Sequence, residues 1–187
     1  MRIGLLTGGG DCPGLNAAIR AVVKQGTGEY GHTIIGFRNG WRGVVGGAVP
    51  PLGRQEIRTG LRGGGTRGAA ARVHPREEDG SMDAVLATVE AEHLDALICI
   101  GGDGTLHAAS RVAEAGVKIV AIPKTIDNDV EGTDLSIGFH TAVNIATEAL
   151  DRVHTTAERP NRVLVVEGMG RHAGWIAGDA GVGGGGA

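Results

Sequence analysis

The sequence predicts an α/β protein, with a parallel sheet covered by helices on both faces, and three observations carry this prediction. Short apolar runs bounded by glycine or proline occur at residues 2–6, 33–37, 96–100 and 118–123, and such runs are typical of strands buried on both faces. Segments with apolar residues at helical spacing lie between several of these runs. Two of the runs lead through a glycine-rich turn into a helical segment, which is typical of βα units.

The length is compatible with one domain, or with one domain and part of another. Its 187 residues suffice for one domain with a real core. We expect an α/β domain over residues 1–138 and the start of a second, incomplete α/β domain over residues 139–187. The closing stretch from Gly181 to Ala187 is rich in glycine and does not resemble the end of a domain.

Charge, hydropathy and cysteine content narrow the function classes. The net charge of −3 gives no indication of a nucleic-acid partner or an acidic membrane surface. No run of about 18 apolar residues is present, so we expect no membrane span. Cys12 and Cys99 form no disulfide pattern, which favours a reduced, cytoplasmic protein. The seven histidines share no metal-ligand spacing, so zinc is not expected.

The first unit begins with a predicted strand at Arg2 to Leu6. The glycine-rich turn Thr7 to Gly14 follows, and then a predicted helix from about Leu15 to Gln25. A helix that starts after such a turn is compatible with phosphate binding. The turn does not read GxGxxG, and no acidic residue about 20 positions later ends a second strand, so the dinucleotide-binding fingerprint is absent.

A second strand and a helix are predicted before the centre of the chain. The strand covers Thr33 to Phe37, and the turn Asn39 to Gly43 comes directly after it. A helix is predicted from Ser81, a plausible N-cap, to Ala91. Its apolar face consists of Met82, Val85, Leu86 and Val89.

The central unit spans Ala96 to Asp129 and reads as strand, helix, strand. The strands are predicted at residues 96–100 and 118–123, and the helix at Thr105 to Gly116, with Gly116 as C-cap. Such a βαβ unit makes the two strands parallel neighbours. The loops that follow them then open at the same edge of the sheet, where ligands bind in such folds. The apolar face of the helix consists of Leu106, Ala109, Val112 and Ala113.

Two further elements are predicted in the last third of the chain. A long amphipathic helix covers Thr141 to Glu158, and a strand covers Arg162 to Glu167. The apolar stripe of the helix consists of Val143, Ala146, Leu150 and Val153.

The loops of the central unit carry the residue types that phosphoryl transfer needs. Gly101 and Gly102 let a phosphate chain lie against their backbone, and the next helix directs its positive end at it. Asp103 supplies a hard oxygen ligand suited to Mg²⁺ held jointly with phosphate oxygens. Asp127 and Asp129 add two carboxylates, and a carboxylate near a bound hydroxyl can act as general base. Together these groups suggest phosphoryl transfer, which depends on positioning and charge neutralisation.

The two loops differ in how specific they are. Gly101-Gly-Asp-Gly-Thr105 resembles the nucleotide loops of 6-phosphofructokinases, NAD kinases and diacylglycerol kinases alike. Pro123-Lys-Thr-Ile-Asp-Asn-Asp129 resembles the catalytic loop of 6-phosphofructokinases, and the other two families lack it. The alternative is an αβ connection with polar turn residues. The pair of motifs favours the 6-phosphofructokinase family.

That resemblance implies a binding site for the phosphoryl donor. Gly9, in an opening that resembles the family's Gly-Gly-Asp-x-Pro-Gly-x-Asn, would approach the nucleotide phosphates. Trp41 would flank the nucleotide, or else be an exposed turn aromatic with a packing role. Arg72 would hold phosphate oxygens, although residues 67–69 depart from the family pattern. The implied donor site consists of Gly9, Gly10, Trp41, Arg72, Gly102, Asp103, Gly104, Thr105 and Lys124.

The resemblance also implies a sugar-phosphate site and a mechanism. Met169, Gly170 and Arg171 would contact fructose 6-phosphate, and Arg162 would reach the sugar phosphate of a neighbouring subunit. In the implied mechanism, Mg²⁺ on Asp103 bridges the donor phosphates, and Asp127 takes the proton from the sugar's 1-hydroxyl. The remaining roles are stabilisation of the transferring group by Thr125, Arg72 and Arg171, support of Asp127 by Asp129, and charge neutralisation by Lys124.

The resemblance runs from Ile3 to Ala187 but covers only about the first half of a phosphofructokinase. The chain therefore looks truncated, and alone we expect it to be inactive. Gly104 is the residue typical of ATP enzymes, whereas Lys124 is usual in enzymes that use pyrophosphate. The combination resembles the actinobacterial ATP enzymes. We favour ATP because Gly104 leaves the backbone open to nucleotide phosphates.

The expected protein is thus a cytoplasmic, allosteric, glycolytic kinase. It uses ATP, Mg²⁺ and fructose 6-phosphate, forms a homo-oligomer (dimer or tetramer), and binds neither nucleic acid nor membrane. Three alternatives stay open. They are a pyrophosphate-dependent phosphofructokinase, an NAD or lipid kinase, and a non-catalytic nucleotide-binding module.

Overall fold

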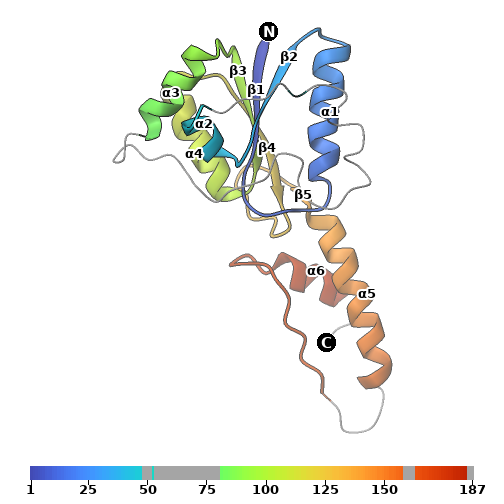
Figure 1. Cartoon of the computed structure of the whole chain (residues 1–187). Helices are drawn as coiled ribbons and strands as arrows, with labels where there is room; N and C mark the ends of the chain where they lie inside the picture. The colour runs from blue at the N-terminus through green and yellow to red at the C-terminus, as the bar shows by residue number, and fades with distance from the viewer. Residues whose placement is uncertain (48–51, 53–80, 158–162, 185–187) are drawn as a thin grey trace.

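A computed structural model describes residues 1–47, 52, 81–157 and 163–184, without the side chains of residues 155 and 157. The described elements alternate strands with helices over most of the chain, as Figure 1 shows. In chain order they are β1 (Arg2–Thr7), α1 (Leu15–Gly28), β2 (Thr33–Phe37), α2 (Trp41–Val45), α3 (Ser81–Ala91), β3 (Ala96–Gly101), α4 (Asp103–Glu114), β4 (Ile119–Thr125), β5 (Ile137–Gly138), α5 (Phe139–Ala157) and α6 (Trp175–Gly183).

The strands form one parallel sheet in the order β2-β1-β3-β4-β5. Chain order reverses beside β1, which lies between β2 and β3. At such a switch point the loops after neighbouring strands diverge and leave a crevice outside their carboxyl ends. The predicted α/β fold with a parallel sheet is confirmed, and so is the βαβ unit made by β3, α4 and β4.

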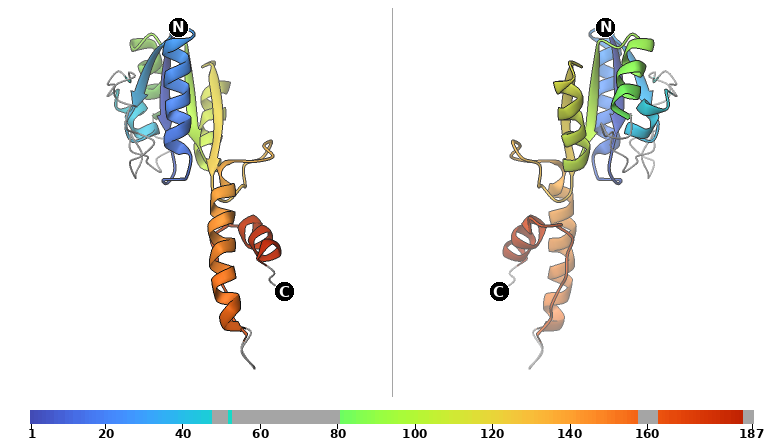
Figure 2. Two further views of the ribbon diagram at one scale, coloured as in Figure 1. Left: turned by 90° about the vertical axis from the view of Figure 1, so that its right-hand side faces the viewer. Right: turned by 90° about the vertical axis from the view of Figure 1, so that its left-hand side faces the viewer.

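Helices cover both faces of the sheet (Figures 1 and 2). On one face α1 packs its buried residues Leu15, Ile19 and Val23 against the strands. The strand residues in that cluster are Ile3, Leu5, Ile34 and Ile100. On the other face α2, α3 and α4 cover a cluster that includes Leu6, Phe37, Leu97 and Cys99. These two clusters are the core that fixes the sheet and the loops at its edge.

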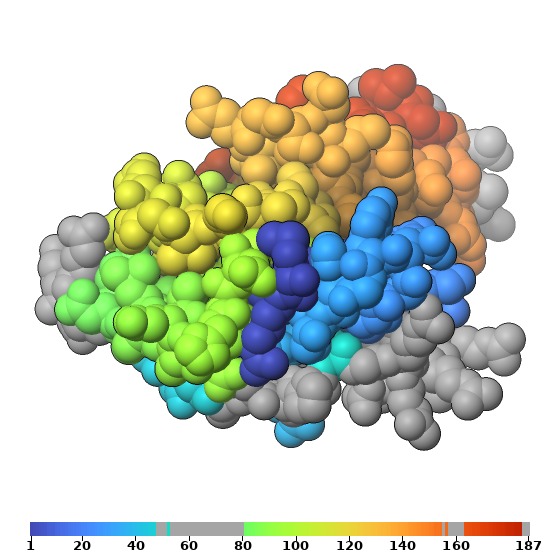
Figure 3. All heavy atoms as spheres, turned by 90° about the horizontal axis from the view of Figure 1, so that it is seen from above, coloured from blue at the N-terminus to red at the C-terminus, as the bar shows by residue number. Residues whose placement is uncertain are grey.

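The end-on view in Figure 3 places the first strand residues between two groups of elements. The segment of β2 and α1 lies on one side, and the segment of α3 and β3 lies on the other. This is the edge of the sheet that carries the amino terminus. The loops that follow β1, β3 and β4 therefore lie at the opposite end of the strands.

β4 departs from the predicted strand that is buried on both faces. Val120 is 54% exposed, and Ala121 is also exposed. Its neighbour β5 has two residues and pairs only with Lys124 and Thr125. In the described part of the chain, neither face of β4 is covered along its whole length. The expectation held for β1 and β3, which are central in the sheet.

The central helix differs from the prediction at its first turn and on one side. α4 begins at Asp103, two residues earlier than expected, so Asp103 and Gly104 lie in its first turn. Its buried residues are Thr105, Ala108, Ala109 and Val112, whereas Ala113 is exposed. Ala115 is the C-cap and Gly116 follows it with φ 98°. The predicted helix is confirmed, but Ala113 was wrongly placed on its buried face.

The last third of the chain forms an arm that we define as α5, residues 163–174 and α6. α5 begins at Phe139 and leads away from the sheet, and α6 lies beside it (Figures 1 and 2). The predicted strand over residues 162–167 is wrong for its described part, since residues 163–170 belong to no helix or strand. A strand needs a neighbour to pair with, and none pairs with these residues in the described structure. The division into domains at residue 138 stays a prediction.

Three elements were not predicted. α2 and β5 are short, and α6 is so rich in glycine that propensity argues against a helix. No helix among the described residues is long and apolar enough to span a membrane.

Candidate active site

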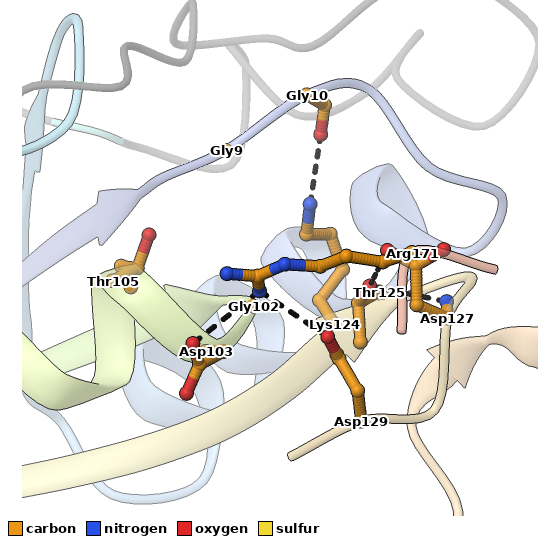
Figure 4. A pocket seen from close by; sticks show the side chains of 11 residues that line it. Gly9, Gly10, Gly102, Asp103, Thr105, Lys124, Thr125, Asp127, Asp129 and Arg171 are labelled. Atoms are coloured by element: carbon orange, nitrogen blue, oxygen red, sulfur yellow. Dashed lines mark hydrogen bonds and ion pairs between the residues drawn. The ribbon is translucent and has the colours of Figure 1, made fainter. Parts of the chain in front are cut away.

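A cleft of about 420 Å³ opens at the carboxyl edge of the sheet. It is formed by the turn after β1, the start of α4, the end of β4 with its following loop, and one residue of the arm (Figure 4). The lining residues are Gly9, Gly10, Gly102, Asp103, Gly104, Thr105, Lys124, Thr125, Asp127, Asp129 and Arg171. All of them were singled out from the sequence, and the structure brings them together from segments far apart in the chain.

The amino end of α4 faces this cleft. Gly102 is the N-cap in an extended conformation, and no side chain caps the helix. Free N–H groups and the positive end of the helix dipole at such a position favour a bound anion. Asp103 and Gly104 line the cleft from this first turn. A polyphosphate could therefore approach the backbone here.

Thr105 fixes how closely the first two loops approach each other. A Cβ at Gly8 would collide with the Thr105 side chain, and a Cβ at Gly101 would lie 2.5 Å from Thr105 Cβ. Thr105 is buried between them. Glycine at these two positions is thus needed for packing as much as for phosphate access.

Lys124 ties the end of β4 to the turn after β1. Its side chain is buried, and Nζ donates to Gly10 O at 2.7 Å. Burial lowers the pKa of Lys124 below its ordinary value, against the opposing effects of Cys12, Asp11 and Asp127. A partly desolvated ammonium attracts a nearby phosphate more strongly than one in open water does.

Asp127 combines a fixed backbone with a free carboxylate oxygen. Its N–H donates to Thr125 Oγ1 at 3.2 Å, and the same hydroxyl lies 3.4 Å from Asp127 Oδ2. Oδ1 is buried and has no hydrogen-bond partner. A buried acceptor without a partner costs free energy, and at a functional site it is available to a hydroxyl of a bound molecule.

Arg171 bridges two carboxylates across the cleft (Figure 4). Its Nη1 lies 3.3 Å from Asp103 Oδ2 and 3.2 Å from Asp129 Oδ2. Because both oxygens lie near one nitrogen, the two carboxylates face a common space. This guanidinium is the contact through which the arm reaches the cleft.

The donor set of the cleft fits Mg²⁺ held jointly with phosphate. Three carboxylates stand against two cationic side chains in the lining, so a polyphosphate needs a further cation to be neutralised. Asp103 and Asp129 provide hard oxygens on a common space, as just described. The described residues form no cluster of three or more metal-ligating side chains. Mg²⁺ characteristically takes one or two carboxylates and completes its shell with water and phosphate oxygens.

A second hollow of about 510 Å³ adjoins the cleft. It shares Asp103, Asp129 and Arg171 with the cleft. Its other lining residues are Asn128, Val130, Glu131, His172, Ala173 and Trp175. These three side chains thus line both spaces.

Trp41 needs correcting among the expected donor-binding residues. Its side chain has no exposed surface, belongs to the core cluster on one face of the sheet, and donates Nε1–H to Thr105 O at 3.3 Å. A ring with no exposed surface has no face to offer a nucleotide, so the structure favours a packing role. The expected exposed turn is wrong as well, because Trp41 is buried at the start of α2. Trp41 supports the cleft indirectly, through the backbone of α4.

The other expected residues lie outside the cleft or outside the described structure. Met169 is 72% exposed, Gly170 is buried, and neither lines the cleft. Arg72 and Arg162 lie outside the described residues. Their expected roles stay predictions.

The structure adds Cys12, Asn128 and Ser136, which the sequence reasoning did not assign to the site. Cys12 Sγ donates to Ile137 O at 3.2 Å and joins the turn after β1 to β5. Burial raises the pKa of Cys12, Lys124 opposes that shift, and Asp127 adds to it. The only sequence signal that could have indicated these residues is their position. Cys12 follows Asp11, Asn128 follows Asp127, and Ser136 precedes the start of β5.

Comparison with known proteins gives a consistent result. A family model described as Phosphofructokinase matches residues 2–187. A pyrophosphate–fructose 6-phosphate 1-phosphotransferase of Streptomyces coelicolor is 54% identical over 186 residues, which are 99% of this chain and 54% of that protein. An ATP-dependent 6-phosphofructokinase of Corynebacterium efficiens is 50% identical over 186 residues, with the same coverage.

The fold of this chain is also similar to that of a solved structure. The T-state phosphofructokinase of Pichia pastoris matches with a TM-score of 0.87 and 32% identity, over 98% of this chain and 21% of that chain. The chain spans about half the length of the curated relatives it matches.

Proposed function

The chain belongs to the phosphofructokinase family, and from this premise we propose that the whole protein transfers the γ-phosphoryl group of ATP to the 1-hydroxyl of fructose 6-phosphate. The products are fructose 1,6-bisphosphate and ADP. One observation carries the proposal. Asp103, at the start of α4, and Asp127, after β4, line the same cleft, so one phosphoryl group could lie between a metal-holding acid and a proton-accepting acid.

The proposed donor site is the side of the cleft made by the turn after β1 and the start of α4. Gly9, Gly10, Gly102, Gly104 and Thr105 would lie against the phosphate chain, and the buried ammonium of Lys124 would neutralise part of its charge. Asp103 would hold Mg²⁺, as expected from the sequence. Asp129, whose expected role was to support Asp127, would be a second ligand, because its carboxylate faces the same space as that of Asp103. When bound, the ion neutralises phosphate charge and orients the transferring group.

The proposed base is Asp127. Its buried Oδ1 has no partner and would accept the proton of the sugar's 1-hydroxyl as that oxygen bonds to the γ-phosphorus and the bond to ADP breaks. Thr125 and Arg171 would stabilise the charge on the transferring group. The family pattern adds Arg72 to this role, and it adds Arg162, Met169 and Gly170 to the sugar-phosphate site.

Pyrophosphate as donor is the second candidate, and two observations favour it. A relative at 54% identity is named a pyrophosphate-dependent enzyme, and Lys124, the residue usual in such enzymes, lies buried in the cleft. Gly104, which lines the same cleft, supports ATP, and so does the name of the relative at 50% identity. We propose ATP because Gly104 leaves the start of α4 open to a nucleotide.

Steady-state kinetics of the whole protein with each donor tests this choice. We expect turnover with Mg-ATP and fructose 6-phosphate, and little with pyrophosphate. The reverse preference would replace the ATP enzyme by the pyrophosphate enzyme. Turnover only with NAD or a lipid as acceptor would favour the corresponding kinase. ATP binding by calorimetry without turnover on any acceptor would favour a non-catalytic module.

Asp127→Ser tests the proposed base. We expect kcat to fall by about 10²–10⁴-fold or more, with little change in sugar binding, because the variant keeps the fold and loses only the proton acceptor. Near-normal turnover would remove Asp127 from this role.

Removal of Mg²⁺ by chelation should abolish turnover with either donor. A cytoplasmic location and a homo-oligomeric assembly of the whole protein belong to the same proposal.

A further inference from the structure

The loop that carries the proposed base leaves the sheet and returns to it at one place. It departs after Thr125, the end of β4, and rejoins at Ile137, the start of β5. The two strands pair there, with Lys124 opposite Ile137 and Thr125 opposite Gly138. The two ends of the loop are thus fixed side by side, while its middle carries Asp127 into the cleft.

Asn128 stands between Asp127 and Asp129 and bonds within the loop. Its Oδ1 accepts from Ser136 N at 2.8 Å, and its Nδ2 donates to Asp134 O at 3.2 Å. Its backbone has φ 52°, in the left-handed region that asparagine tolerates better than most residues. The carboxamide therefore connects the outgoing half of the loop to the returning half.

Ser136 makes the second connection. Its side chain is 5% exposed, and Oγ lies 2.6 Å from Thr125 O and 3.2 Å from Asn128 Oδ1. One hydroxyl carries one proton, and the shorter distance assigns it to the Thr125 carbonyl. Asn128 Oδ1 already receives the Ser136 N–H. The hydroxyl and the N–H of Ser136, and both polar side-chain atoms of Asn128, thus bond within the loop.

These bonds hold the backbone on both sides of Asp127. The Ser136 hydroxyl bonds to the carbonyl of Thr125, whose own hydroxyl accepts the Asp127 N–H. The Ser136 N–H bonds to the side chain of Asn128, the residue directly after Asp127. The carboxylate itself keeps Oδ1 without a partner. A base must be fixed in place and yet keep a lone pair for its substrate, and bonds to its neighbours satisfy both needs.

We propose that Asn128 and Ser136 are positioning residues that aim Asp127 at the acceptor hydroxyl. This inference rests on the proposed function, because it assigns their effect to phosphoryl transfer. A shift of about 1 Å in a reacting group can cost about 10²-fold in rate. Loss of the Ser136 hydroxyl should therefore lower kcat and leave the binding of both reactants nearly unchanged.

The test compares Ser136→Ala with Ser136→Thr and with a matched control in the whole protein. We expect Ser136→Ala to lower kcat about 10- to 100-fold with KM for both reactants within about threefold. Ser136→Thr keeps the hydroxyl and should restore most of kcat. The control is Thr88→Val, since Thr88 is 8% exposed, its Oγ1 donates to Val44 O at 2.7 Å, and neither residue lines the cleft. The Thr88→Val variant should be less stable than the wild type but should keep the wild-type kcat.

A second variant removes the other connection without straining the backbone. Asn128→Gly deletes the carboxamide, and glycine adopts positive φ freely. It should show the same fall in kcat at nearly constant KM. If Ser136→Ala and Asn128→Gly both keep wild-type kcat, or if Thr88→Val loses as much kcat as Ser136→Ala, the positioning role is wrong.

Hydrogen exchange separates this inference from the proposed function. Amides of residues 126–137 should exchange faster in Ser136→Ala than in the wild type, and Thr88→Val should leave them unchanged. Unchanged exchange in Ser136→Ala would overturn the positioning role. Lack of turnover by the wild type with either donor would overturn the proposed function instead, and the exchange result would still decide whether these bonds fix the loop.

Discussion

Two apolar runs of similar composition lie in opposite environments. The run in β3, at residues 97–100, is buried or partly buried between β1 and β4. The run Val163 to Val166 is exposed along its length and belongs to no strand. β-branched and apolar residues favour a strand only where neighbours can pair with it and cover it. The comparison shows that the strand signal lies as much in the neighbours as in the run.

The same contrast separates the sheet region, residues 2–138, from the arm. The sheet region buries two apolar clusters between its strands and helices. In the arm, the stripe of α5 is only half-buried, and Ile145, Trp175 and Val182 are exposed. The sheet region thus contains its own core, whereas the arm leaves several apolar side chains exposed.

The largest test of this contrast is a pair of matched truncations in the chain. Leu97→Ala removes a fully buried side chain from β3 and should lower the free energy of unfolding by about 2–5 kcal/mol. Val165→Ala acts on a side chain that is 92% exposed and should change it by no more than about 0.5 kcal/mol. Urea unfolding measures both. An equal cost at the two sites would mean that the arm is packed in solution.

Two glycine substitutions, one at the cleft and one in the arm, should change the free energy of unfolding in opposite directions. Gly101→Ala places a methyl group 2.5 Å from Thr105 Cβ at the cleft and should cost about 1–3 kcal/mol. Gly178→Ala lies in α6, where a Cβ would meet nothing within 4 Å, and should stabilise by about 0.4–1 kcal/mol. Thermal unfolding of both variants gives the signs. Destabilisation by Gly178→Ala would indicate that α6 is more closely packed than described.

The smallest effect is a pH dependence that arises in the sheet core. Burial raises the pKa of Cys99 from 9.0 to about 12. Between these values the unfolded chain has lost the thiol proton while the folded chain keeps it, so stability falls as pH rises. At about pH 10 the loss should be about 1.4 kcal/mol relative to about pH 8.

Cys99→Ala is the control for this effect. It removes the titrating thiol, so the difference in unfolding free energy between the wild type and the variant should shrink by that amount over the same range. A constant difference would show that the thiol is not buried in its neutral form. The arm contains no cysteine and contributes nothing to this pH dependence.

Much of the site could be predicted because loops after parallel strands meet at one edge. Asp103 and Asp127 follow adjacent strands, and strand order alone brings them together. Periodicity located α1, α3, α4 and α5. These features depend on patterns that repeat along the chain, which the sequence displays directly.

The rest depends on contacts that no local pattern contains. Trp41 lies in the core because α2 starts there and packs against the sheet, whereas a glycine-flanked aromatic suggested an exposed turn. The strand predicted around Val165 failed because nothing described pairs with it. Ser136 is important only because the loop returns to Thr125, and a polar residue in a linker gives no sign of that.

The lining of the cleft also has a consequence for how the protein is made. Among the described residues around it, every one except Arg171 belongs to the first 129 positions. Domains generally fold as units, with the amino-terminal one first during synthesis. We therefore expect a nascent chain that has emerged only through β5 to carry all of the described lining except Arg171, which joins it later in synthesis.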